Sequence, residues 1–170
     1  MFRYKNPIFL FLFCILSIPL LSKIITIDSH IDIPFDYMEN PEHDPGKITD
    51  MQVDLYKMKK GGLDSGFFVV YVPQGPLDKA GFKNARLLAE KKFLAISKMI
   101  KTYSNQIGLA LAPEDIIQLK NNKLLSAAIG IENGYVIGED LSLLDYYYSL
   151  GARYMLSLIH ISEPTRRTTI

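Results

Sequence analysis

The run Phe67-Phe68-Val69-Val70-Tyr71-Val72, followed by Pro73, decides the fold class of this 170-residue chain. It is a short, unbroken apolar run that starts just after Gly66 and ends at the proline. An apolar run of this length, without polar alternation, is typical of a strand that is buried on both faces. Strands buried on both faces occur mainly in parallel sheets that are covered by helices. The run therefore predicts an interior strand of such a sheet.

Segments on both sides of this run predict further strands and helices in alternation. Strands are expected at 23–33, 125–131 and 152–156, and helices at 53–60, 84–103, 113–120 and 140–150. The longest helix is indicated by apolar residues at steps of three and four, and residues 39–50 are expected to be a polar loop. Alternating strands and helices predict an α/β fold, either a small doubly wound domain or half of an eight-stranded barrel. No glycine-rich phosphate loop follows the first strand, which disfavours a nucleotide-binding domain.

Composition and the N-terminus restrict the class of protein. The 48% hydrophobic and 22% charged content is that of a globular protein, and a net charge of +1 provides no basic surface for nucleic acid. Arg3 and Lys5 precede an apolar stretch over residues 8–21. This pattern predicts a secretory signal or an uncleaved anchor in residues 1–22, so we expect an exported protein: periplasmic, extracellular or membrane-anchored. The single cysteine, Cys14, lies in this stretch, which leaves no thiol for a disulfide or a nucleophile if the segment is removed.

The stretch Ile27-Asp28-Ser29-His30-Ile31-Asp32-Ile33-Pro34 carries candidate metal ligands. On a strand alternate side chains share a face, so Asp28, His30 and Asp32 are expected to point the same way. At a rise of ~3.3 Å per residue, the Cα atoms of His30 and Asp32 lie roughly 6.6 Å apart. Two side chains can close that gap onto one cation through bonds of ~2 Å. Taken alone, such a pair is more often a hydrogen-bonded polar cluster at a strand end.

Two further residues follow predicted strands. Glu132 comes directly after the strand at 125–131, where the sheet would bring its carboxylate to the same edge as His30. Such a carboxylate can bridge two metal ions, although an isolated glutamate here is more often a cap or turn residue. Tyr71 shares a strand face with Phe67 and Val69. It is a candidate substrate contact, and a half-buried core tyrosine fits equally well.

Together these segments resemble the membrane (renal) dipeptidase family, a family of zinc metallopeptidases, over residues 25–155. Residues 28–34 resemble the family's Asp-Gly-His-Asn-Asp-Leu-Pro signature, and residues 129–134 its Ile-Glu-Gly-Gly segment. Residues 53–55, 60–62, 67–73 and 150–155 are similar to further blocks in the same order. Ser29 and Asn133 replace glycines of the pattern, which changes no ligand.

The resemblance implies a (β/α)8 TIM barrel of the metal-dependent hydrolase type. Residues 23–155 would form its N-terminal half, about four β/α units. The implied cofactor is zinc, two ions in the intact enzyme, with His30 and Asp32 on one ion and Glu132 bridging both. Tyr71 would line the substrate pocket, and a metal-bridging water would attack the peptide bond of a dipeptide substrate. We further expect a homodimer as an assembly compatible with this family, membrane association through the N-terminal segment, and no nucleic-acid partner.

Residues 156–170 do not continue the family pattern. The fourth-strand motif should read on to a histidine at position 159, where this chain has isoleucine, and His160 follows one residue late. The segment resembles a translated sequencing-library adapter, so we expect it to be a non-native tail. The family resemblance also implies two further histidine ligands and an acid from later strands, and this chain has none of them. The 170-residue chain is therefore expected to be inactive. The alternatives are another metal-dependent barrel amidohydrolase and a non-enzymatic exported binding domain.

Overall fold

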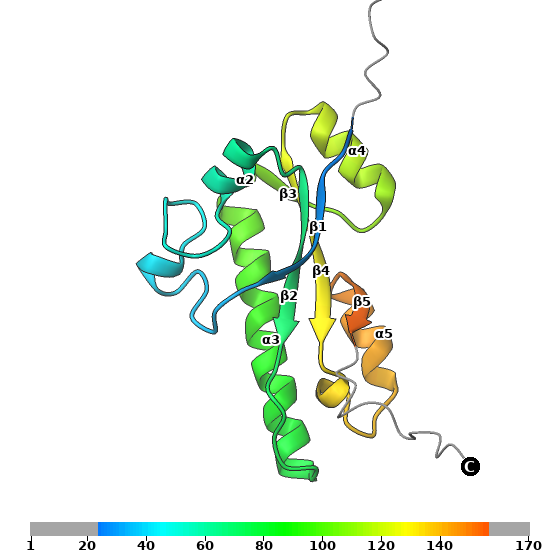
Figure 1. Cartoon of the computed structure of the whole chain (residues 1–170). Helices are drawn as coiled ribbons and strands as arrows, with labels where there is room; N and C mark the ends of the chain where they lie inside the picture. Colours follow the sequence, from blue (N-terminus) through cyan, green and yellow to red (C-terminus); the bar gives the residue numbers. More distant parts are fainter. Residues whose placement is uncertain (1–23, 157–170) are drawn as a thin grey trace, which may run out of the picture.

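The computed structural model describes residues 24–156, which form an α/β unit around one parallel sheet (Figure 1). The sheet path is β1-β2-β4-β3, and β5 also pairs with β4. All four strand pairings are parallel. The strands are β1 Ile27–Asp32, β2 Ser65–Tyr71, β3 Ile107–Leu109, β4 Leu125–Glu132 and β5 Ala152–Leu156. The predicted α/β fold with a parallel sheet is confirmed.

Strand β4 is the centre of the sheet. Its pairing with β2 runs without a break from Ser65 opposite Ser126 to Tyr71 opposite Glu132. On its other edge, β3 pairs with the first half of β4, and β5 with the second half. Strands β1, β2, β4 and β5 are therefore consecutive neighbours in an arc, as in part of a barrel. The sequence did not predict β3, because three residues are too few to show a strand pattern.

Helices connect the strands and cover one face of the sheet. They are α2 Leu55–Gly61, α3 Lys79–Thr102, α4 Pro113–Asn121 and α5 Ser142–Ser149, with 3-10 turns η1 Pro41–His43 and η2 Gly134–Val136. Helix α3 begins at Lys79, earlier than the expected Asn84, because Asp78 caps it and accepts a hydrogen bond from the Gly81 N–H. The apolar spacing visible in the sequence starts only at Ala85, one and a half turns into the helix.

The core lies between the sheet and the long helix α3, which runs along it (Figure 1). Phe68 and Val70 of β2 face inward there with Phe93 and Ile96 of α3, all of them buried. Tyr147 of α5 stacks on Phe93 with ring centroids 5.6 Å apart. Because side chains alternate along a strand, Phe67, Val69 and Tyr71 lie on the face of β2 opposite this core, where Val69 is buried and the two rings are half-buried.

Strand β1 departs from regular alternation. It starts at Ile27 rather than at Lys23, and its register with β2 shifts between Asp28 and Ile31, where β1 contains one extra residue. The expected sharing of one face by Asp28, His30 and Asp32 is therefore interrupted after Asp28. Ile31 packs over Gly66, where its Cδ1 lies 2.1 Å from the place that a Cβ would take. A larger residue at position 66 would have to displace the end of the Ile31 side chain.

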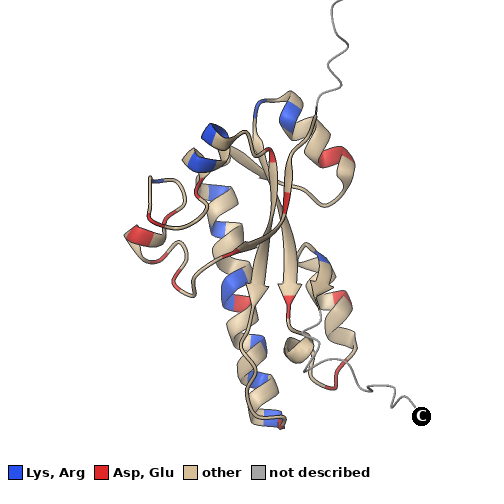
Figure 2. Cartoon of the chain, viewed as in Figure 1, with Lys and Arg blue, Asp and Glu red and all other residues tan. Residues whose placement is uncertain are grey.

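Two predicted segments lie outside the described residues: the N-terminal signal or anchor, 1–22, and all but the first residue of the tail, 156–170. Among the helices between residues 24 and 156, none has the length and apolar character needed to cross a membrane. Figure 2 shows basic residues along α2, α3 and α4, and acidic residues in the loop after β1 and at the carboxyl end of β4.

Candidate metal centre

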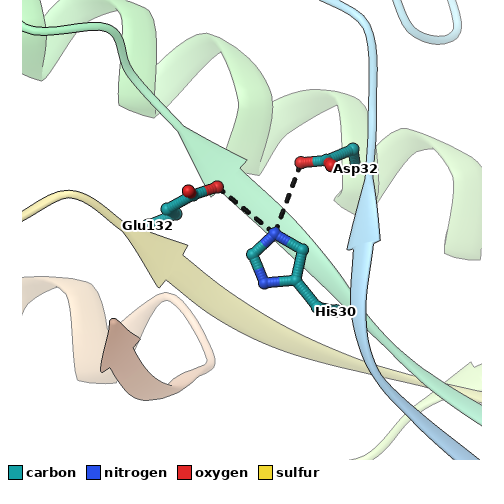
Figure 3. Close-up of side chains that lie close together, drawn as sticks. All are labelled: His30, Asp32 and Glu132. Atoms are coloured by element: carbon teal, nitrogen blue, oxygen red, sulfur yellow. Dashed lines mark ion pairs between the residues drawn. The ribbon is translucent and has the colours of Figure 1, made fainter. Parts of the chain in front are cut away.

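Three of the predicted site residues converge at one edge of the sheet (Figure 3). The Nε2 atom of His30 lies 3.2 Å from Oε2 of Glu132 and 3.5 Å from Oδ1 of Asp32. One ligand atom from each residue falls within 4.8 Å of the others. Within residues 24–156 this is the one group of histidine, cysteine or acidic side chains close enough to hold a metal ion.

The strands explain this convergence. His30 and Asp32 are two residues apart at the carboxyl end of β1, so both side chains project from the same face of the strand. Glu132 ends β4, and β2 aligns the two strands because Val69 pairs with Asp32 and Tyr71 with Glu132. Parallel strands end at the same edge of a sheet, which in barrel enzymes is the edge that carries the chemistry.

The donor set fits zinc. A tetrahedral ion with bonds of about 2.0–2.1 Å separates its nitrogen and oxygen ligands by roughly 3.3 Å. The two distances from His30 Nε2 bracket that value. The side chain of Glu132 is 18% exposed, that of His30 32% and that of Asp32 75%, so the group is anchored in the sheet and still open to solvent. One imidazole and two carboxylates supply the nitrogen and oxygen donors that zinc accepts.

Tyr71 lies next to this group rather than in it. It is half-buried and pairs with Glu132 in the sheet register. Its ring lies 5.9 Å from the ammonium of Lys92, a residue that the sequence reading did not single out. Tyr71 therefore borders the site, as a substrate contact would.

Lys92 of α3 is a buried cation beside the site. It is 3% exposed, its Nζ donates a 2.7 Å hydrogen bond to the Ile33 carbonyl, and it lies 4.5 Å over the ring of Phe35. Burial lowers the pKa of Lys92 to about 8, opposed by the negative charges of Asp32 and Glu132. The signal in the sequence was a lysine three residues after Ala89 and four before Ile96, on the apolar side of α3.

Tyr154 of β5 also reaches the site and was not predicted to do so. Its hydroxyl donates a 2.9 Å hydrogen bond to the Ser29 carbonyl and lies 3.5 Å from Nδ1 of His30. Its ring packs against Phe67 with centroids 5.0 Å apart. Burial raises the pKa of Tyr154, and the charges of Glu132, Asp32 and Asp28 raise it further, so the hydroxyl keeps its proton.

His43 is held elsewhere. In the loop after β1 its Nδ1 lies 2.5 Å from Oδ1 of Asp36, so this histidine is paired away from the metal-ligand candidates. Hydrogen bonds from Asn40 and then from His43 hold the pKa of the Asp36 carboxyl below its usual range. The remaining histidine, His160, lies outside the described residues.

A parallel α/β sheet with a histidine and two carboxylates at the carboxyl ends of its strands defines the class of metal-dependent barrel hydrolases. Within that class the chain belongs to the membrane dipeptidase family, peptidase family M19, whose sequence profile matches residues 17–165. The matched range runs past Met155, and the origin of the tail stays a prediction.

Relatives and solved structures agree with this assignment. Dipeptidase 3 of Mus musculus is 26% identical over 143 residues, which cover 81% of this chain and 27% of the mouse protein. The probable dipeptidase PvdM from Pseudomonas aeruginosa superposes with a TM-score of 0.72 at 26% identity, over 81% of this chain and 35% of that structure. The barrel fold is thus shown, with this chain forming part of it.

A third protein is similar in fold. The metallopeptidase from Rhodobacter sphaeroides, liganded with a phosphinate mimic of the dipeptide L-Ala-D-Ala, has a TM-score of 0.64 at 21% identity. The match covers 78% of this chain and 44% of that structure. The chain thus spans less than half the length of each of these proteins.

Proposed function

We propose that this chain is the metal-binding part of a zinc-dependent dipeptidase. The observation that carries the proposal is the convergence of His30, Asp32 and Glu132 at distances that suit zinc. Family membership supports a metallopeptidase acting on dipeptides. The Rhodobacter sphaeroides structure, with its bound dipeptide mimic, supports the same substrate class.

Each residue has a distinct part in the proposed site. His30 and Asp32 would hold one zinc ion, and the Glu132 carboxylate would serve a second ion as well. Zinc, when bound, lowers the pKa of a coordinated water to near neutrality and polarises the scissile carbonyl. Tyr71 borders the place where the dipeptide would lie, and its hydroxyl can hydrogen-bond the substrate. The buried Lys92 lies near both carboxylates, and their negative charges favour its protonated form.

The proposed site is tested by zinc titration calorimetry on the 170-residue chain and on His30→Asn and Glu132→Gln. Both substitutions remove a ligand while keeping a similar shape, so we expect each to weaken zinc binding by more than about 100-fold, the upper range for losing an outer partner of a ligand. His43→Asn is the matched control, because His43 also faces a carboxylate but lies outside the group. Equal zinc affinity in all four proteins would refute the proposal.

We also propose export, with residues 1–22 acting as the signal or anchor. The support is the charge pattern of Arg3 and Lys5 before an apolar stretch. Fusing residues 1–22 to a reporter enzyme that is active only outside the cytoplasm tests it, with Arg3→Glu/Lys5→Glu as the control. Reporter activity that does not depend on the segment would contradict the proposal.

A further inference from the structure

We propose that Tyr154 is a positioning residue for His30: its hydroxyl holds the imidazole in the tautomer that leaves Nε2 free for a metal ion. This inference rests on the proposed zinc site and deepens it.

The hydroxyl of Tyr154 has one proton, which it donates in a hydrogen bond to the Ser29 carbonyl. The oxygen-to-oxygen distance is 2.9 Å, and a carbonyl can only accept. Toward His30 Nδ1, 3.5 Å away, the same oxygen can therefore only act as an acceptor. The favourable arrangement places a proton on Nδ1, and the neutral ring then has its lone pair on Nε2.

Nε2 is the nitrogen that faces the acids. It lies 3.2 Å from Glu132 Oε2 and 3.5 Å from Asp32 Oδ1, the two contacts that are dashed in Figure 3, whereas the Tyr154 hydroxyl lies near Nδ1, the other ring nitrogen. A histidine that binds a metal through one nitrogen commonly donates its other N–H to an outer partner, which fixes the tautomer and the ring orientation. The Tyr154 hydroxyl stands where that partner is required.

The fold keeps the tyrosine ring in place. The ring lies over Gly130 of β4, on the face of the sheet that carries Phe67. A Cβ at position 130 would lie 2.1 Å from the Cζ atom of Tyr154. Phe67 of β2, the strand on the far side of β4 from β5, packs against the ring. Tyr154 thus crosses from β5 over β4 and β2 to β1, and the absence of a side chain at Gly130 is what permits this path.

Imidazole nitrogen NMR on the metal-free chain tests the inference at about pH 8.5, where histidines are ordinarily neutral. His30 is identified by the signal that His30→Asn removes. We expect His30 to carry its proton on Nδ1, and Tyr154→Phe to shift its population toward the Nε2–H form. Zinc titration should show about tenfold weaker binding for Tyr154→Phe, the usual effect of losing such a partner.

Two variants complete the design. Tyr135→Phe is the control, because the buried Tyr135 hydroxyl likewise donates to a main-chain carbonyl, that of Pro76, at 2.7 Å. It should change neither the His30 tautomer nor zinc affinity. Gly130→Ala should displace the Tyr154 ring and reproduce the effects of Tyr154→Phe with the hydroxyl present. Amide spectra show which variants keep the native fold.

The outcomes separate this inference from the proposed function. An Nε2–H tautomer in the unmodified chain, an unchanged tautomer in Tyr154→Phe, or undiminished zinc affinity would overturn the role of Tyr154. Zinc binding that depends on His30 and Glu132 would still support the metal site in that case. If the tautomer responds as expected while no zinc binds, the proposed function fails and the hydrogen-bonding role stands.

Discussion

At the scale of single residues, Lys92 shows how a charge can be kept inside this fold. The Lys92 residue is only 3% exposed, so its ammonium loses much of its hydration, and one hydrogen bond to the Ile33 carbonyl replaces little of it. The ring of Phe35 and the carboxylates of Asp32 and Glu132 offset part of the cost. The remaining cost is a pKa lowered from the ordinary 10.5 to about 8, which corresponds to roughly 3 kcal/mol.

The lowered pKa predicts a pH-dependent stability that Lys92→Met should abolish. Between about pH 8 and 10.5 the unfolded chain keeps the proton that the folded chain has lost, so folding stability contributed by this residue rises with pH across that window. Urea denaturation at several pH values should show the native chain gaining up to roughly 3 kcal/mol relative to Lys92→Met. Lys98→Met is the control, since Lys98 is an exposed lysine of the same helix that donates to the Met38 carbonyl. A constant difference between native and Lys92→Met chains would contradict the burial of a charge here.

At the scale of elements, the short helix α2 depends on one buried carboxylate. Oδ1 of Asp54 caps the helix by accepting from the Lys57 N–H at 2.7 Å. Oδ2 accepts from the Thr49 N–H at 3.0 Å and so ties the preceding loop to the helix. Burial acts to raise the pKa of Asp54, but the hydrogen bonds from Lys57 and Thr49 together outweigh it and hold the pKa below its usual value. Asp54, the middle residue of the Val53-Asp54-Leu55 block, therefore has a structural role: it caps α2 and attaches the preceding loop to it.

Asp54→Ala should destabilise the fold by about 3 kcal/mol, because it removes a helix cap and leaves the half-buried Thr49 N–H without the buried carboxylate that accepts its hydrogen bond. Asp78→Ala, which removes the exposed cap of α3, should cost only about 1 kcal/mol. Urea denaturation at pH 7 measures both. Since the pKa of Asp54 is lowered, its contribution is present above the usual aspartate range and is lost as the pH falls through the folded pKa. Equal effects of the two substitutions would show that the loop attachment is unimportant.

At the scale of the whole molecule, the sheet has two open edges among the described residues. On one side β1 pairs only with β2, and on the other β3 and β5 each pair only with β4. In a closed barrel each strand has two neighbours, and open edges favour pairing with other chains. The matched structures are more than twice as long as the segment they share with this chain.

The 170-residue chain by itself should therefore hydrolyse no dipeptide, even with excess zinc, and should self-associate. The ligands and acid that the family resemblance places in later strands would complete the site. Release of free amino acid from L-Ala-D-Ala measures activity, and size-exclusion chromatography with light scattering measures association. Zinc-dependent hydrolysis by the purified monomeric chain would contradict this prediction.

Local patterns were sufficient to predict much of this protein. The apolar run at Phe67–Val72, the spacing along α3 and the His-x-Asp pair identified the sheet, the longest helix and two ligand candidates, because each depends on residues within a few positions of one another. Glu132 was found in the same way, as the residue that ends a buried strand. The structure then placed all three site residues together.

The partners of the site were decided by tertiary structure alone. Tyr154 meets a carbonyl 125 residues away, and Lys92 meets one 59 residues away. Neither contact leaves a local pattern, since each depends on which strands become neighbours and on the space left at Gly130. The extra residue in β1 and the short strand β3 likewise could not be predicted from local sequence. Strand register depends on how chain segments pack against one another, and the alternation of apolar and polar residues within one segment does not reveal it.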